Sequence, residues 1–167
     1  MLLDGQMNGA DKEKSMENVK GRMYVRGKIP SVNIVTAYSK AFRIGGGWLS
    51  WLKMLIYGNP FKIADTYYQE ADDELIRAIV DADLGDKEDY ETEDYDCDDF
   101  AFRLMGIFHC DRYAASMPIF ITWVEMPEGG HAVVSYINEH REVVIIEPQN
   151  DNMFPVPTDW KLQLLCG

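Results

Sequence analysis

The spacing of apolar and polar residues predicts helices in the first two thirds of the chain and strands in the last third. Helices are predicted over residues 34–42, 48–57 and 72–83, and a fourth helix is predicted to begin at or near Cys97. In each of these segments apolar residues recur three and four positions apart, which places them on one helical face. Three acidic residues at 72–74 also suit the positive N-terminal end of a helix.

Three strand candidates follow the helices, at 119–126, 131–137 and 142–147. The last two flank the polar string N-E-H-R at 138–141, a plausible hairpin turn. Helices followed by consecutive strands predict an α+β fold with a helical N-terminal part and a C-terminal antiparallel sheet. We expect a single domain over residues 28–167 and a flexible N-terminal tail over 1–27.

The charge of the chain changes the range of plausible partners. The 167 residues carry a net charge of −12, which argues against nucleic-acid binding because phosphate recognition needs a basic face. Residues 1–64 hold ten Lys/Arg and four Asp/Glu, whereas residues 65–99 hold two and sixteen. The acidity is therefore concentrated in the stretch that ends at Cys97.

The three cysteines match neither a disulfide framework nor a zinc-ligand spacing. The first residues show no signal-peptide pattern, so a cytoplasmic location is expected. The helix predicted over 48–57 is too short to span a bilayer. Its tryptophans allow a membrane-surface helix, but with Lys53 as its one basic residue a core helix with no membrane partner is favoured.

Three short strings contain residues suited to thiol chemistry: D-Y-D-C-D-D-F-A at 94–101, G-G-H-A-V-V at 129–134 and I-I-E-P-Q-N-D at 145–151. Cys97 at a helix N-terminus would be favoured as a thiolate by the helix dipole. His131 at the start of a strand could act as base and then acid, and Glu147 could orient its ring. This arrangement predicts Cys97 as the most reactive cysteine.

The predicted hairpin places a geometric condition on this set of residues. Directly opposed residues of an antiparallel pair share a face, so His131 must lie opposite residue 147 or 149 for Glu147 to reach it. A four-residue loop would send Glu147 to the other face. The interpretation therefore predicts a loop of three or five residues, or a bulge.

The same strings resemble the papain-like and transglutaminase-like cysteine peptidase superfamily. They are most similar to the calcium-dependent cysteine-protease domains of mushroom agglutinins and to bacterial transglutaminase-like cysteine peptidases. The resemblance implies a papain-like fold and thiol acyl-transfer chemistry by a Cys97–His131–Glu147 triad. The expected reaction is hydrolysis of a peptide or amide bond in a peptide or protein substrate, with transfer to an amine as the lesser alternative. It covers roughly residues 94–151.

One departure from the papain-like pattern leaves a second interpretation open. The upstream Gln that often serves as an oxyanion donor is missing, because Gln69 is too far from Cys97 in sequence. Tyr90, Tyr95 or Gln149 could replace it. The alternative is a catalytically silent binding module on the same fold, with the acidic stretch as a metal or partner surface.

The acidic residues around Cys97 also have two interpretations. Asp98 and Asp99 could cap the helix or favour its first turn. They could instead bind calcium, with Asp96 and Asp151 as further ligands, because hard cations take several oxygen ligands. The resemblance favours calcium. Without a cation, these carboxylates would raise the pKa of the Cys97 thiol.

Overall fold

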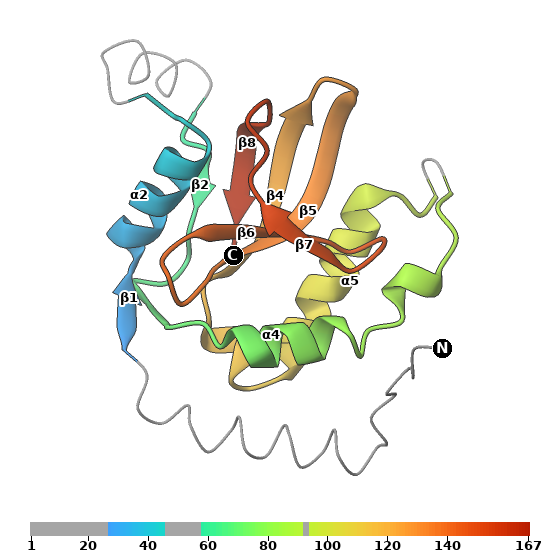
Figure 1. The fold of residues 1–167 in the computed structure, drawn as a ribbon, viewed down its shortest axis with the longest axis horizontal. Helices are drawn as coiled ribbons and strands as arrows, with labels where there is room; N and C mark the ends of the chain where they lie inside the picture. Colours follow the sequence, from blue (N-terminus) through green and yellow to red (C-terminus); the bar gives the residue numbers. More distant parts are fainter. Residues whose placement is uncertain (1–26, 46–57, 92–93) are drawn as a thin grey trace, which may run out of the picture.

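A computed structural model describes residues 27–45, 58–91 and 94–167 (Figure 1). Its elements in chain order are β1 (Lys28–Pro30), α2 (Ser31–Ala41), β2 (Phe61–Lys62), β3 (Tyr67–Gln69), α4 (Asp73–Val80), the 3-10 turn η2 (Gly85–Lys87), α5 (Cys97–Cys110), the 3-10 turn η3 (Ala114–Ser116), β4 (Ile119–Met126), β5 (Gly129–Ile137), β6 (Val143–Glu147), β7 (Asn152–Pro155) and β8 (Lys161–Cys166).

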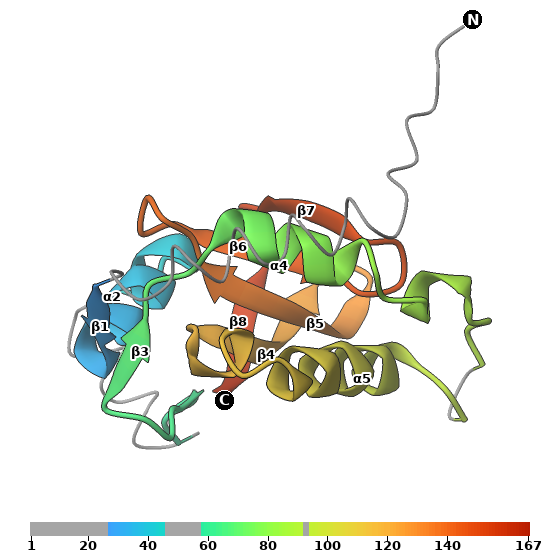
Figure 2. The ribbon, with the colours of Figure 1, turned by 90° about the horizontal axis from the view of Figure 1, so that it is seen from below.

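The centre of the molecule is a six-stranded mixed sheet with the order β2-β8-β4-β5-β6-β7. Its neighbours are antiparallel except at one edge, where β2 pairs with β8 in parallel. Strands β1 and β3 form a separate two-stranded antiparallel sheet. Figures 1 and 2 show α5 and α4 packed near β5 and β6, with α2 at the opposite side of the molecule.

Two hydrophobic cores lie on opposite faces of the sheet. Successive residues such as Val133 and Val134, or Ile145 and Ile146, belong to different cores because side chains alternate along a strand. One core contains the apolar faces of α4 and α5. The other contains the apolar face of α2 with residues of β1 and β3.

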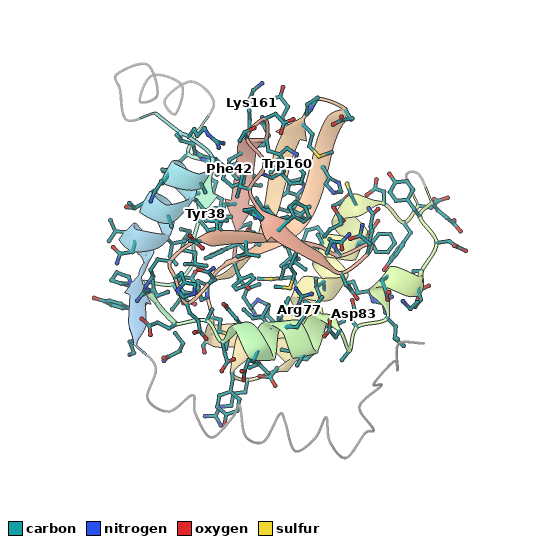
Figure 3. The ribbon with its side chains drawn as sticks, in the orientation of Figure 1. Tyr38, Phe42, Arg77, Asp83, Trp160 and Lys161 are labelled. Carbon is teal, nitrogen blue, oxygen red and sulfur yellow. The ribbon has the colours of Figure 1, made fainter. Side chains whose placement is uncertain are left out.

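Buried hydroxyl groups connect α2 to the sheet. The Tyr38 hydroxyl lies 2.7 Å from Ser135 Oγ, and Thr122 Oγ1 lies 2.5 Å from the same atom. All three residues are fully buried. Figure 3 shows Tyr38 on α2 and Phe42 directly after its last residue. Burying these polar groups is tolerable because they bond to one another.

Most of the helices and strands expected from periodicity are present. The helices over 34–42 and 72–83 correspond to α2 and α4, and α5 begins at Cys97 as predicted. The strand candidates correspond to β4, β5 and β6. The helix predicted over 48–57 lies outside the described residues, as does nearly all of the tail predicted over 1–27. No helix in the described ranges is long and apolar enough to cross a membrane.

The predicted fold class is wrong in two respects. The part of the chain before α5 is not simply helical, since it contributes β1, β2 and β3, and the main sheet is mixed rather than antiparallel. These strands have only two or three residues, too few for an alternating pattern to be read. The C-terminal strand β8 was also missed, although it inserts between β2 and β4.

Candidate functional site

The acidic residues before and after Cys97 build the start of helix α5. Asp96 is the N-cap, and its carboxylate accepts a hydrogen bond from the Asp98 backbone N–H at 3.3 Å. The Asp99 carboxylate accepts in return from the Asp96 backbone N–H at 3.2 Å, which completes a capping box. The interpretation of these aspartates as helix-capping residues is confirmed for Asp99, and Asp98 lies in the first turn.

The surroundings of Cys97 disfavour the thiolate form of its side chain. Partial burial raises its pKa above the ordinary value of 9.0, and the carboxylates of Asp96 and Asp98 raise it further. The Ala132 backbone N–H donates to the sulfur and lowers the pKa, but this does not reverse the direction. The pKa of Cys97 is therefore shifted away from the thiolate that was expected at a helix N-terminus, first by burial and then by the carboxylates.

The predicted contact between His131 and Glu147 is present. Strands β5 and β6 pair Ile137 with Val143, so the loop between them has five residues, 138–142. Extending this register places 131 opposite 149, as the prediction required. His131 Nε2 lies 2.6 Å from Glu147 Oε2, and the Gln149 backbone N–H donates to the other carboxylate oxygen at 3.4 Å.

An aromatic side chain completes the surroundings of this pair. Trp160, labelled in Figure 3, precedes β8. Its ring meets the His131 ring edge-on, with ring centroids 6.3 Å apart. Phe154 on β7 holds Trp160 from another side, with ring centroids 5.9 Å apart. Sequence reasoning missed Trp160. The alternation in W-K-L-Q-L-L-C at 160–166 was the available signal, because it is typical of a strand.

The structure brings His131 and Glu147 together, but it does not connect the His131 ring to the Cys97 thiol. Cys97 packs against the core formed with α4 and α5, whereas Trp160, the neighbour of His131, packs against the other core. Within the described residues no hydrogen bond joins Cys97 to the imidazole. The contact that Cys97 makes with β5 is to the backbone of Ala132.

The residues considered as oxyanion donors have other partners. Tyr95 packs against Phe100 with ring centroids 4.6 Å apart, and its hydroxyl interacts with the Arg103 guanidinium. Gln149 contacts Glu147 through its backbone, with its side chain half-buried. Neither contact places a donor at Cys97.

The four carboxylates expected to bind calcium divide into two groups. Ligand atoms of Asp96, Cys97 and Asp98 lie within 4.8 Å of one another, and Asp99 serves the capping box. Asp151 instead faces a different set of acids, which raises its pKa to about 6 through burial and through the charges of Asp86, Asp83 and Asp81.

The donor set at the start of α5 suits calcium poorly. Its carboxylates already accept backbone hydrogen bonds, and a thiol is a soft ligand among hard oxygens. In the second group, buried oxygens of Asp86 and Asp151 have no hydrogen-bond partner in the described part of the chain. Figure 3 shows Asp83 near Arg77 at the end of α4.

Comparisons with known proteins give matches among solved structures alone. No family model matches the chain, and no curated protein is significantly similar to it in sequence. A structure titled "PSL1a-E64 complex" matches with a TM-score of 0.67 and 16% identity over 84% of this chain. A Polyporus squamosus lectin, described as bound to the human-type influenza-binding epitope Neu5Aca2-6Galb1-4GlcNAc, matches with a TM-score of 0.65 and 17% identity over the same share.

These matches correct the identification made from the motifs. The chain shares its fold with chains of a lectin, so the assignment to papain-like or transglutaminase-like cysteine peptidases is wrong, as are the predicted papain-like fold and the classification as a hydrolase. A peptide or protein substrate likewise has no support. At this level of identity the likeness shows the fold alone. The chain spans about half the length of the lectin chains, 51% and 49%.

Proposed function

We propose that this domain is a ligand-binding module without hydrolytic activity, and that its ligand is a carbohydrate. The observation that carries the proposal is the state of Cys97. Nucleophilic catalysis needs a thiolate beside a base. Here burial and two carboxylates raise the pKa of the thiol, and the His131 ring bonds to Glu147 rather than to sulfur.

His131, Glu147 and Trp160 supply the chemistry that a sugar requires. Sugar hydroxyls donate and accept hydrogen bonds, so one hydroxyl can bond to a carboxylate and to an imidazole. An indole adds a flat apolar surface with a polar edge. The side chains of His131 and Glu147 keep 15% and 13% of their surface exposed, which leaves an edge of the pair accessible to a ligand.

The carbohydrate class is supported by the lectin structure, whose title names a sialylated trisaccharide as its ligand. The charge of the present chain favours a neutral sugar instead. Its net charge is −12, and Asp96 and Asp98 flank the cysteine that contacts β5 beside His131. A negative field of this kind repels anionic ligands. We therefore expect N-acetyllactosamine to bind better than its sialylated form.

Titration calorimetry of the full chain with N-acetyllactosamine and with sialyl-N-acetyllactosamine tests this proposal. Glu147→Gln and Trp160→Phe should weaken binding, because each keeps the shape and removes one interaction. Cys97→Ser is the matched control and should bind as the wild type does. Absence of binding to both sugars, or loss of binding in Cys97→Ser, would contradict the site.

The absence of catalysis needs a separate measurement. The full chain is incubated with E64, the compound named in one matched title, and the intact mass is recorded. E64 carries an epoxide that alkylates nucleophilic thiols, so no adduct is expected on Cys97. A stoichiometric adduct that disappears in Cys97→Ser and in His131→Gln would refute the silent-module proposal.

A further inference from the structure

A groove of about 610 Å³ lies where the C-terminal end of α2 faces β6 and β7. Figure 1 shows α2 beside the β5–β6 turn, and α2 contacts β6 directly. The volume is within the range of small-molecule sites. The groove is lined by Ala37, Lys40, Ala41, Arg43, Arg141, Glu142, Val143, Val144, Met153, Phe154, Pro155 and Val156.

The rim of the groove is basic. Lys40, Arg43 and Arg141 are all exposed. Among the described residues no carboxylate lies within ion-pair distance of Lys40 or Arg43. The Arg43 guanidinium donates to the Thr158 carbonyl at 3.3 Å, which orients it without neutralising its charge.

Two acidic residues near the rim are already engaged. Glu70 forms an ion pair with Arg141. The Glu142 carboxylate accepts from Asn138 Nδ2 at 3.4 Å within the β5–β6 turn. Glu142 keeps its charge, because an amide hydrogen bond does not neutralise a carboxylate, so Lys40 and Arg43 leave this end of the groove with a small positive excess in a chain whose net charge is −12.

The floor of the groove is apolar. Val143, Phe154 and Val156 belong to or pack against the core beneath α2 and form this floor, and the short side chains of Ala37 and Ala41 line the groove from α2. Phe154 is held by its edge-on contact with Trp160, so the floor does not depend on a ligand for its shape. An apolar floor beneath basic side chains matches a ligand with an apolar body and an anionic head.

We propose that this groove binds a small amphiphilic carboxylate, with its chain against β6 and β7 and its head at Lys40 and Arg43. Three observations support the site: its volume, its apolar lining and two cations without a carboxylate partner in the described residues. The ligand class follows from charge complementarity, because anions are repelled by most of this protein and attracted here. The groove adjoins the carbohydrate site proposed above, because Phe154 lines the groove and its ring contacts Trp160.

Calorimetric titration of the full chain with decanoate tests the proposal, with decanol and acetate as probes of the two halves of the ligand. Decanoate should bind, decanol and acetate should bind much more weakly, and salt should weaken the decanoate complex. In the double variant Lys40→Gln/Arg43→Gln the affinity for decanoate should fall about 25-fold. Each removed charge, at about 4 Å from the ligand carboxylate, accounts for about a fivefold loss. Decanol binding as tightly as decanoate would overturn the assignment of the head-group site.

Two further variants make the result specific. Lys62→Gln removes a charge from exposed Lys62 on β2, at the other edge of the sheet, and should leave decanoate affinity unchanged. Ala41→Phe fills the groove and should abolish decanoate binding, while N-acetyllactosamine binding and the melting temperature report that the fold is intact. Equal affinity in Ala41→Phe and wild type would place the ligand elsewhere and refute the proposal.

Discussion

The alkylation of Cys97 as a function of pH tests whether this thiol is prepared for catalysis. Burial, with the carboxylates of Asp96 and Asp98, raises the pKa of this thiol above its ordinary value, so the protonated form is favoured at pH 7. Only the thiolate reacts with iodoacetamide. We therefore expect the rate at Cys97 to keep rising beyond pH 9 and, at pH 7, to be lower than at exposed Cys110 and Cys166.

Removing the two carboxylates beside the Cys97 thiol tests how far they raise its pKa. A unit charge near 4 Å contributes about 1 kcal/mol in water, close to 0.7 of a pKa unit. Asp96→Asn together with Asp98→Asn should therefore lower the pKa of Cys97 by about one unit and raise its rate at pH 7 about tenfold. Asn is also a good N-cap residue, so α5 should keep its first turn.

The assay is a series of timed iodoacetamide reactions from pH 6 to 10 in a calcium chelator, followed by mass mapping of the three cysteine peptides. Asp65→Asn, which removes an exposed charge between β2 and β3, is the matched control and should not change the profile. His131→Gln should not change it either, because no hydrogen bond in the described residues joins the ring to the thiol. A half-maximal rate below pH 8, or a large effect of His131→Gln, would refute this account of the site.

Three further predictions concern stability and metal binding. Ser135→Ala should lower the free energy of unfolding by about 2–4 kcal/mol in urea titrations, because it leaves the buried hydroxyls of Tyr38 and Thr122 without their shared hydrogen-bond partner. A loss of stability smaller than that in Tyr38→Phe would contradict this hydrogen-bond network. Asp151 is harder to ionise in the folded state, with a pKa of about 6 against 3.8, so its contribution to stability is lost as pH rises from 4 to 7. Asp151→Asn should thus be more stable than wild type at pH 7, by about 1 kcal/mol once solvent screening is allowed for. Near pH 3.5 the two proteins should be equally stable. Asn also tolerates the positive φ of 59° at this position. Because the donor set at the start of α5 suits calcium poorly, melting curves in calcium and in chelator should coincide; a rise in melting temperature with calcium that Asp98→Asn removes would show instead that these aspartates bind the ion.

Local patterns were sufficient to predict the elements that carry the candidate site. Helix α5 was expected at Cys97 because apolar residues repeat at helical spacing after an aspartate-rich start, and the capping box is a local interaction. The contact between His131 and Glu147 was predictable because a hairpin register depends on the few residues of its turn. The five-residue loop follows one of the two lengths that the prediction allowed.

The interpretation of the same residues as a catalytic triad failed because sequence order does not fix which side of a strand faces a helix. His131 and Ala132 are neighbours in sequence, yet it is the Ala132 backbone that meets Cys97. Burial of the thiol, and then the carboxylates of Asp96 and Asp98, raise its pKa through distances and packing that no motif specifies. The residue that contacts the His131 ring, Trp160, comes from a segment outside every motif.

The sequence by itself determined the helix at Cys97, the three consecutive strands and the acidic character of the segment before them, because each depends on residues close together in the chain. The tertiary structure alone decided that β8 inserts beside β4 with β2 in parallel, and that the end of α2 faces β6 and β7 to form a basic groove with an apolar floor. Such contacts join residues far apart in the chain, such as Glu125 with Lys161 and Phe61 with Leu165. Their free energy comes from burying apolar surface between elements, which depends on packing in three dimensions rather than on local periodicity.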